Sequence, residues 1–551
     1  MENMDFDLRS VQEARDLCRY GAVAADRIAK FSEAQIDQIL RNMVKVAEEH
    51  VYELAQMAVE ETGFGKVNDK AYKNHAAATL LYDYIKDMKT QGIICEDKEK
   101  KIFEVAEPVG LIMGIVPSTN PTSTVIYKSM IAIKSRNAIV FSPHPSALKC
   151  TRRAAELMAQ AAVEAGAPSD VIGCLSMCTM PATDELMHND AIKLIIATGG
   201  PGMVKAAYSA GKPAIGVGAG NSPAYIERTA DVHQAVTNII ASKTFDYGTI
   251  CASEQSIICE ECNHDAVVEE LKRQGAYFLN PEELKKVCGL LFKNGGHAMN
   301  AKYVGRSARV IAEGAGISVP ADTTVLVGLQ SGVGDGNPLS YEKLTSVLAF
   351  YTVRDWLEAC DLSIRLLQNG IGHTMSIHTQ DEHIVREFAS KPASRILVNT
   401  GGSMGGTGLS TALAPAFTLG CGTWGGSSVS DNVTPMHLIN KKTVAYGIKN
   451  VTTMVQDDPT FRVNHSGSCC NTATTASPIS YSAGCSSCGC DAASPASFAN
   501  NSQAAAHVGN VMASQAPEQA VRAPELAEDQ GVNLEQLKDM INGLVQAMKG
   551  E

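Results

Sequence analysis

The residue in this sequence that is best suited to chemistry is a cysteine. Cys251 follows a glycine-bearing loop and precedes an apolar, β-type run over residues 255–259. A cysteine between a loop and a strand lies on backbone that a substrate can reach, and its thiolate is a strong nucleophile. The chain contains 16 cysteines, and a buried structural thiol is the commoner fate of a lone cysteine. The neighbouring residues must therefore decide between these interpretations.

Residues 244–255 read TFDYGTICASEQ. This segment resembles the nucleophile motif of the aldehyde dehydrogenase superfamily. Within the superfamily it is similar to the coenzyme A (CoA)-acylating branch, which includes the N-terminal half of bifunctional aldehyde-alcohol dehydrogenases. The resemblance covers residues 10–460, with its motifs in the expected order. It implies an α/β fold with a Rossmann-type NAD-binding domain and an α/β catalytic domain that carries Cys251.

Asn120 lies in a second motif, residues 117–121, which read PSTNP. The motif resembles the loop in which the family places an asparagine. The resemblance implies that the side-chain amide of Asn120 and the backbone N–H of Cys251 hold the oxyanion that forms when the thiolate attacks. Each preorganised donor of this kind contributes roughly 3 kcal/mol to catalysis. On its own, Asn120 would be interpreted as a turn residue before a proline.

A third group of residues suits a dinucleotide. Residues 198–203, TGGPGM, follow a β-type run and open a helix. Their backbone N–H groups can face a pyrophosphate, although two glycines after a strand often serve only a tight turn. Residues 141–146 resemble the family's adenosine-ribose loop, with Ser142 where hydrolytic members usually have lysine. Glu342 matches the glutamate that holds the nicotinamide ribose in the family, or is an ordinary exposed acid.

We therefore expect NAD as the cofactor, with NADP left open, and CoA as a co-substrate. The residues expected to contact the dinucleotide are Ser142, Pro143, His144, Thr198, Gly199, Gly200, Gly218 and Glu342.

The type of reaction depends on the glycine-rich residues 212–223, KPAIGVGAGNSP. Hydrolytic aldehyde dehydrogenases carry a glutamate near the middle of this stretch and use it as a general base that activates water. The matching position here is Val217, and no carboxylate lies between Lys212 and Pro223. Water attacks a thioester slowly without a base. A thiol acceptor can then take the acyl group.

Two further segments, residues 370–378 and 417–426, are similar to signatures of the acylating branch. His373 is interpreted either as a polar, proton-handling group of the site or as a packed, hydrogen-bonded histidine. The glycine-dense loop around Trp424 suits close approach of substrate or CoA, and Cys421 is interpreted as structural.

These motifs predict an oxidoreductase that converts a short-chain aldehyde, NAD and CoA to acyl-CoA and NADH. The reaction would pass through a thiohemiacetal and an acyl thioester on Cys251. Acetaldehyde and propionaldehyde are equally good candidates for the substrate. One alternative is a hydrolytic aldehyde dehydrogenase that releases free acid. Another, of a different class, is a metal or thiol carrier that uses the C-terminal cysteines.

The composition excludes several classes of protein. Of the 551 residues, 45% are hydrophobic and 19% are charged, which is enough to bury a large core in more than one domain. No apolar run approaches the ~20 residues of a membrane helix, and the N-terminus is acidic and polar, unlike a secretory signal. The net charge of -12 disfavours nucleic acid. We expect a cytoplasmic protein with no membrane partner. The resemblance of the C-terminal helix to encapsulation peptides, described below, implies the lumen of a bacterial microcompartment.

The first hundred residues are expected to be mostly helical, with one long helix from the Ser32–Gln35 capping box to Gly63. After them, β-type runs alternate with helix-like stretches, which predicts βα units on mostly parallel sheets. The predicted strands are residues 110–116, 138–141, 194–197, 255–259, 324–327, 349–353 and 395–398.

We predict five segments along the chain. They are an NAD-binding domain (1–224), a catalytic thiol domain (225–432), an oligomerisation segment that returns to the NAD domain (433–462), a flexible linker (463–530) and an amphipathic helix (531–551). Within the third segment, residues 436–451 resemble the family's exchanged strand, which implies a homodimer or homotetramer.

The C-terminal segments raise separate questions. The linker is rich in Ser, Ala and Thr and poor in large apolar residues, so it cannot bury enough surface to become ordered. Its cysteines Cys485, Cys488 and Cys490 are candidates for a metal site, but solvated thiols are the favoured interpretation. The final helix resembles the encapsulation peptides that carry enzymes into microcompartments, where it would bind shell or core proteins; packing on its own domain is the alternative.

Overall fold

The structure is a computed structural model that describes residues 5–293 and 298–454. The predicted linker with Cys485, Cys488 and Cys490, and the predicted terminal helix, lie outside these residues. In the described part of the chain, no helix is both long enough and apolar enough to cross a bilayer.

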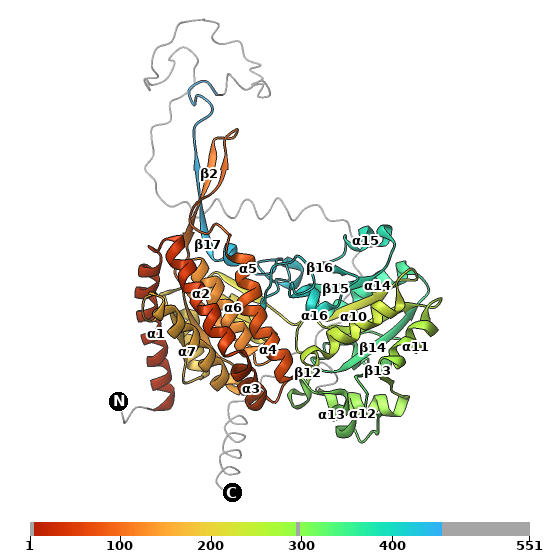
Figure 1. Cartoon of the computed structure of the whole chain (residues 1–551). Helices are drawn as coiled ribbons and strands as arrows, with labels where there is room; N and C mark the ends of the chain where they lie inside the picture. Colours follow the sequence, from red (N-terminus) through yellow and green to blue (C-terminus); the bar gives the residue numbers. More distant parts are fainter. Residues whose placement is uncertain (1–4, 294–297, 455–551) are drawn as a thin grey trace, which may run out of the picture. The chain divides into compact units, whose positions relative to one another are not determined.

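The N-terminal residues form a group of helices that pack on one another, against the first sheet and on the helices that cover it (Figure 1). Their buried faces carry the small and aliphatic residues whose helical spacing is visible in the sequence. The helices are α1 (Phe6–Ile28), α2 (Glu33–Glu49), α3 (Val51–Thr62), α4 (Val67–His75), the π-helical Ala76–Leu80, and α5 (Leu81–Ile85).

The long helix expected between Ser32 and Gly63 is two helices. The Ser32–Gln35 capping box is present, and Gly63 ends α3 with a left-handed φ of 70°. Between them, His50 leaves the helical conformation (φ -117°, ψ 8°). Its Nδ1 lies 2.5 Å from Glu53 Oε2, in the first turn of the second helix. Hydrophobic periodicity does not reveal a break of one residue, because the apolar positions continue across it.

The first sheet has five parallel strands in the order β5-β4-β3-β6-β7. The strands predicted at 110–116, 138–141 and 194–197 are among them. Short, fully buried apolar runs of this kind are typical of a parallel sheet. The strands are β3 (Leu111–Ile115), β4 (Ala138–Ser142), β5 (Ile172–Cys174), β6 (Ile192–Thr198) and β7 (Ala214–Val217), with helices α6 (Pro121–Lys134), α7 (Leu148–Glu164), α8 (Met180–His188) and α9 (Pro201–Ser209).

Three of the predicted motifs follow strands of this sheet. Ile115 pairs with Ser142 and with Ala197 in the parallel registers. The loops after β3, β4 and β6 therefore leave from the same, carboxyl edge of the sheet. Ligands of open α/β sheets bind at this edge.

The second sheet has seven parallel strands in the order β10-β13-β14-β9-β8-β15-β16. The four strands predicted after residue 225 are present as β9, β13, β14 and β16. The strands are β8 (Ser222–Ile226), β9 (Glu254–Glu260), β10 (Ala276–Phe278), β13 (Val325–Leu329), β14 (Val347–Val353), β15 (Gly372–His378) and β16 (Ala393–Val398). The helices are α10 (Val232–Thr244), α11 (His264–Arg273), α12 (Pro281–Leu291), α13 (Ala308–Gly314), α14 (Trp356–Leu367), α15 (Glu382–Phe388) and α16 (Gly402–Gly406), and β11 (Phe292–Lys293) pairs with β12 (Ala298–Met299).

The functional candidates of this second sheet lie at or just before the starts of their strands. Cys251 comes just before β9, and His373 is the second residue of β15. Ser222 pairs with Glu254, and Ser376 pairs with Ala224. The parallel registers therefore bring Cys251, His373 and the loop before β8 to one amino edge.

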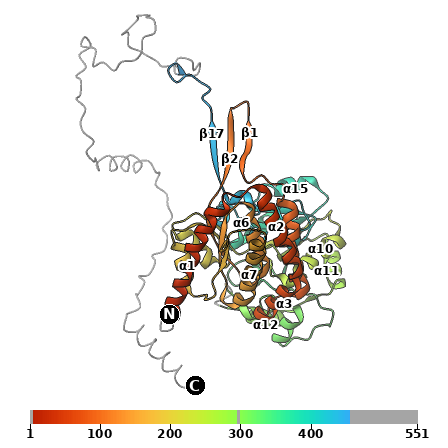
Figure 2. The same cartoon turned by 60° about the vertical axis from the view of Figure 1, so that its left-hand side comes forward.

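A third, antiparallel sheet consists of β1 (Gly92–Asp97), β2 (Ile102–Pro108) and β17 (Ile439–Ala445). It projects from the other described elements in both views (Figures 1 and 2). β17 lies within the predicted segment 436–451, and after Ile439 its residues are exposed. The chain is tied back to the first sheet before β17, because Asn137 Nδ2 donates to Leu438 O at 2.8 Å.

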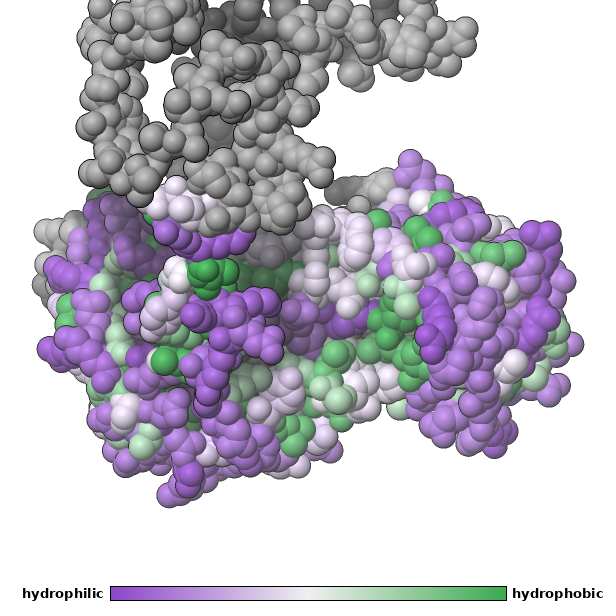
Figure 3. Space-filling model, turned by 90° about the horizontal axis from the view of Figure 1, so that it is seen from above, coloured by the Kyte–Doolittle hydropathy of each residue, from purple (hydrophilic) through white to green (hydrophobic). Residues whose placement is uncertain are grey.

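The core divides between the two large sheets. One cluster of buried residues joins the first sheet to α1, α2, α6 and α7, and two others lie on the second sheet. On the face shown in Figure 3, hydrophilic residues cover the outer parts, whereas hydrophobic residues gather toward the middle. The stabilisation of both sheets comes mainly from the apolar surface that these clusters bury.

Candidate active site

The carboxyl edge of the first sheet and the amino edge of the second enclose a cavity of about 480 Å³. The loops after β3, β4, β6 and β7 supply one wall, and the loop before β9 supplies another. Residues predicted from separate motifs line this single cavity: Asn120, Ser142, Pro143, His144, Thr198, Gly199, Gly200, Gly218, Cys251 and Glu342. Tertiary structure therefore brings together segments that are more than 200 residues apart in the chain.

Cys251 keeps some solvent exposure, but protein surrounds its sulfur. Burial raises the pKa of the thiol to about 12, and Glu342 and Cys421 raise it further, whereas Arg395 lowers it. The free protein therefore holds Cys251 as a thiol. A cation placed in the cavity would favour the thiolate, because an opposite charge stabilises the ionised form.

His373 contacts this thiol. Its Nε2 lies 3.1 Å from Cys251 Sγ, and its Nδ1 lies 2.9 Å from Thr374 Oγ1. Burial, reinforced by the charge of Arg395, holds the pKa of His373 well below its usual value. The imidazole is therefore neutral. With Cys251 protonated, its S–H donates to Nε2, and the Nδ1–H group donates to Thr374.

Arg395 holds His373 and Thr374 in place through hydrogen bonds. Its Nε donates to Thr374 Oγ1 at 3.1 Å, and its Nη2 donates to the carbonyl of His373 at 3.0 Å. Nη2 also donates to Gly420 O at 2.6 Å, which ties the glycine-dense loop to the same group. His373 is thus both packed and in contact with Cys251, so the two interpretations of this residue are compatible.

The glycine-rich loop after β7 lies against the backbone of Cys251. A Cβ atom on Gly220 would come within 1.9 Å of Cys251 O, so this close approach requires glycine. Glu342 Oε1 accepts a hydrogen bond from Gly220 N at 2.9 Å. Val217 lines the cavity, and Glu342 is the one carboxylate among the described lining residues. Burial raises the pKa of Glu342 to about 7.

The part of the cavity formed by the first sheet has room for a ligand beside the backbone. Cβ atoms built on Gly200 and Gly218 would meet nothing within 4 Å. Gly200 is the N-cap of α9. Pro201 has no N–H and Met203 N donates to Gly200 O at 3.0 Å, so the Gly202 N–H is the first-turn donor that a ligand can use. These features fit a dinucleotide. No lysine or arginine is among the described residues that line the cavity.

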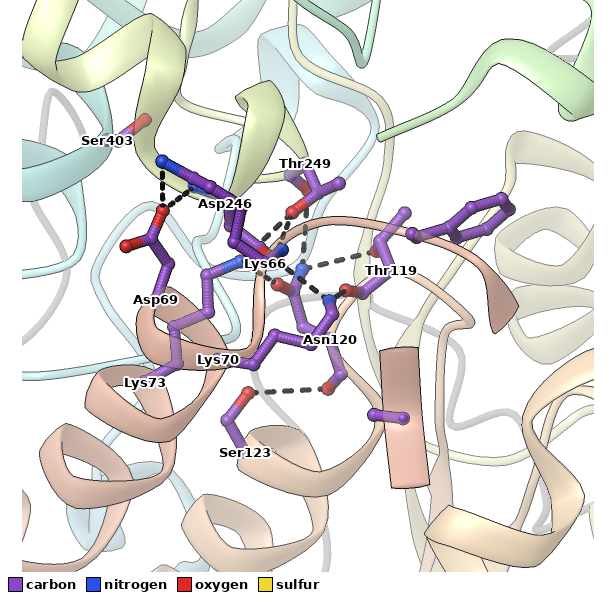
Figure 4. Close-up of polar contacts among 12 residues, drawn as sticks. Lys66, Asp69, Lys70, Lys73, Thr119, Asn120, Ser123, Asp246, Thr249 and Ser403 are labelled. Atoms are coloured by element: carbon purple, nitrogen blue, oxygen red, sulfur yellow. Dashed lines mark hydrogen bonds and ion pairs between the residues drawn. The ribbon is translucent and has the colours of Figure 1, made fainter. Parts of the chain in front are cut away.

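Sequence reasoning missed a buried polar cluster beside Asn120 (Figure 4). Lys70 and Lys73, one turn apart on α4, both contact Asp246 Oδ2, at 2.9 and 2.5 Å. Lys73 Nζ also donates to Asn120 Oδ1 at 2.7 Å. Asp246 lies within the nucleophile motif, but two lysines on a polar helix resemble an ordinary solvated face. No local pattern in the sequence signals that these lysines are buried.

Comparison with known proteins agrees with this geometry. Residues 4–279 match the aldehyde dehydrogenase family. The chain is also 36% identical to the succinate-semialdehyde dehydrogenase (acetylating) of Clostridium kluyveri, over 78% of this chain and 95% of the relative. The chain belongs to the aldehyde dehydrogenase family. The predictions of family and of an α/β, aldehyde dehydrogenase-like fold are thereby confirmed.

Other members of the aldehyde dehydrogenase family are more similar over part of their length. The chain is 47% identical to the bifunctional aldehyde-alcohol dehydrogenase AdhE of Escherichia coli (strain K12), over 80% of this chain and 50% of that protein. The chain therefore spans about half the length of this relative.

Solved structures of the family are also similar. An acetylating aldehyde dehydrogenase from Geobacillus thermoglucosidasius has a TM-score of 0.79 and 52% identity, over 81% of this chain and 99% of that one. A propionaldehyde dehydrogenase of Rhodopseudomonas palustris, with bound CoA and an acylated cysteine, has a TM-score of 0.71 and 26% identity, over 79% and 97%. A propionaldehyde dehydrogenase from a fucose utilisation microcompartment of Clostridium phytofermentans has a TM-score of 0.72 and 26% identity, over 79% and 97%.

Proposed function

We propose that this protein is a CoA-acylating aldehyde dehydrogenase that converts a short-chain aldehyde, NAD and CoA to acyl-CoA and NADH. The observation that carries the proposal is the cavity itself. Cys251 lies in it beside His373 and Asn120, and Val217, the predicted match to the hydrolytic base, also lines it. The relatives named as acetylating enzymes, and the relative with bound CoA and an acylated cysteine, support the same reaction.

In the proposed mechanism, His373 Nε2 receives the proton of Cys251, and the thiolate adds to the aldehyde carbon. A thiohemiacetal alkoxide forms, to which Asn120 and the Cys251 backbone donate hydrogen bonds. A bound NAD would supply the acceptor for the hydride of this carbon. The carbonyl group re-forms, and Cys251 then carries the acyl group as a thioester.

The second half of the reaction returns the enzyme to its starting state. His373 first releases to solvent the proton that it took from Cys251, and it then accepts the proton of the CoA thiol, which attacks the thioester carbonyl. The bond between the acyl carbon and Cys251 Sγ breaks, and Cys251 leaves as a thiolate that takes the proton back from His373. Water competes poorly, because no carboxylate lies at Val217 to activate it.

The lining of the cavity supports choices of substrate and cofactor. The C. kluyveri relative is named for succinate semialdehyde, which carries a carboxylate. Burying that charge without a cationic partner is costly, and no lysine or arginine lines this cavity within the described residues. We therefore propose an uncharged aldehyde. For the same reason we propose NAD, since NADP brings a 2′-phosphate that Arg or Lys usually binds.

One assay tests these choices together. NADH formation is measured from aldehydes of two to four carbons and from succinate semialdehyde, with and without CoA, and with NADP in place of NAD. We expect turnover only with uncharged aldehydes, NAD and CoA, with acyl-CoA as the product. Rapid acid production without CoA would favour the hydrolytic alternative.

Assembly and location are part of the proposal. β17 is an exposed edge strand, which supports a homodimer or homotetramer formed through this sheet. Sedimentation of a variant lacking 439–445 tests this assembly.

We also propose a microcompartment lumen as the location, with residues 531–551 binding shell or core proteins. The relative from a fucose utilisation microcompartment supports this. A fluorescent protein fused to 526–551 should concentrate in such compartments, and diffuse fluorescence would contradict the proposal.

A further inference from the structure

The buried cluster around Asp246 joins three segments whose relative positions must stay fixed for the proposed reaction. Lys70 and Lys73 come from α4, Asp246 from the turn before Cys251, and Asn120 from the loop before α6 (Figure 4). Asn120 belongs to the first sheet and Cys251 to the second. The cluster therefore links the residue proposed to bind the oxyanion with the loop that carries the nucleophile.

The cluster is deeply buried and unusually charged. The side chains of Lys73 and Asp246 are 1% and 0% exposed. Burial opposes ionisation of Asp246, but Lys70 and Lys73 outweigh it and hold the pKa of this carboxyl below its usual value. Two lysines share this one carboxylate, so a positive charge remains beside Asn120. Buried charges are kept only where they are paired and hydrogen-bonded.

The geometry of the turn adds to this constraint. Asp246 and Tyr247 have φ values of 50° and 51°, in the left-handed region that non-glycine residues rarely adopt. Asp246 Oδ1 accepts from Lys66 N, and Oδ2 accepts from Thr249 Oγ1, both at 2.7 Å. A Cβ atom on Gly65 would lie 1.8 Å from Asp246 Oδ1. The carboxylate is thus held from several sides.

Lys73 decides which way the amide of Asn120 faces. An ammonium group only donates hydrogen bonds, so the atom of Asn120 that lies 2.7 Å from Lys73 Nζ must be its carbonyl oxygen. The Nδ2 donors are then turned away from Lys73. They make only longer contacts, at 3.2 Å to Thr119 Oγ1 and 3.4 Å to Thr249 O, which an oxyanion in the cavity can replace.

We propose that Lys73 is a positioning residue, which, held by Asp246, fixes the Asn120 amide so that its N–H groups face the oxyanion formed at Cys251. The inference rests on the proposed function and concerns the same site. The remaining positive charge also polarises the amide and strengthens its N–H donors. Preorganised donors of this kind act on the transition state and leave ground-state binding of the aldehyde unchanged.

The test compares Lys73→Met with Lys73→Gln. The two replacements are similar in size, but only glutamine can donate a hydrogen bond to Asn120. Folding should tolerate both, because Asp246 keeps Lys70 as its partner. We expect Lys73→Met to slow the first-turnover burst of NADH by roughly tenfold to a hundredfold with KM for the aldehyde unchanged, and Lys73→Gln to recover part of the rate.

A double-mutant cycle identifies the residue through which Lys73 acts. In an Asn120→Ala background, Lys73→Met should cause little additional loss, because the group that it positions is gone. Lys70→Met is the matched control. Lys70 shares α4 and Asp246 but donates to Thr119 O, so any loss that it causes should combine additively with Asn120→Ala. Alkylation of Cys251 by iodoacetamide should proceed at the wild-type rate in Lys73→Met.

The outcomes separate the inference from the proposed function. Acyl-CoA formation by the wild type tests the function alone. If Asn120→Ala slows the burst but Lys73→Met does not, or if their losses add, the inference is overturned and the function stands. Loss of Cys251 alkylation in both Lys73 variants would show a structural role and would also overturn it. An Asn120→Ala variant with a normal burst would overturn both the oxyanion role and the inference.

Discussion

His373 Nε2 lies 3.1 Å from Cys251 Sγ, across the amino edge of the second sheet. Cys251 precedes β9, and His373 lies in β15, so the contact spans 122 residues of chain. β8 lies between these two strands in the sheet, and the loop before β8 passes against the Cys251 carbonyl. The pair is therefore fixed by strand order.

Replacement of the nucleophile is the first prediction. Cys251→Ala should abolish both NADH formation and acyl-CoA formation, because no thiohemiacetal can form. Cys95→Ser is the control, since Cys95 is exposed on β1, away from the cavity, and should leave turnover intact. Turnover near the wild-type rate in Cys251→Ala would remove the basis of the assignment.

The environment of Cys251 predicts an unusual pH profile for alkylation. Because burial raises the pKa of this thiol to about 12, the iodoacetamide rate of the free enzyme should still be rising with pH above 9. No step should appear near pH 6.5, since the pKa of His373 is held well below its usual value. A plateau reached below pH 8 would show that Cys251 is already a thiolate. Rates are followed by mass spectrometry of the labelled peptide.

A carboxylate at Val217 should change the product. Val217→Glu places a base on the cavity wall, where it can activate water toward the acyl thioester. We expect CoA-independent acid formation to rise by roughly tenfold or more. Val217→Gln is the matched control, because it has a similar size but no base. Equal acid formation by both variants would show that space, and not a base, limits hydrolysis.

Glu342 predicts a dependence of stability on pH. Burial raises its pKa to about 7 in the folded protein, from the ordinary glutamate value of 4.5, so the folded state binds the proton more tightly than the unfolded chain. Its contribution is therefore greatest at low pH and is lost as pH rises from about 4.5 to 7. Glu342→Gln should raise the free energy of unfolding at pH 8 by roughly 2–3 kcal/mol and leave it little changed at pH 5.

Urea unfolding at the two pH values checks this prediction. Glutamine keeps an acceptor for the Gly220 N–H, so the comparison isolates the charge. A gain in stability of equal size at pH 5 and pH 8 would contradict the assigned cause. The same variant should raise KM for NAD if Glu342 holds the nicotinamide ribose.

Seven of the twelve strands of the two large sheets are predicted from the sequence. Each of the seven contains a short apolar run, and such patterns depend on neighbouring residues only. β5, β7, β8, β10 and β15 are not among the predicted strands. The break at His50 cannot be predicted, because the apolar positions of α2 and α3 continue across it. The prediction of a helix end at Gly63 is confirmed, since its left-handed φ favours glycine.

The sequence by itself was enough to predict Cys251 as the nucleophile, the loop of Asn120, the glycine turn after β6 and the lack of a carboxylate near Val217, because each lies in a short motif that resembles the family's. Only the tertiary structure decided which side chains contact Cys251 and Asn120. Asp246 and Lys73 are 173 residues apart, and His373 and Cys251 meet through the order of strands. Buried charges and parallel registers produce no periodic pattern along the chain. The partners of Cys251 and Asn120 can therefore be identified only from the tertiary structure, in which the two sheets face each other.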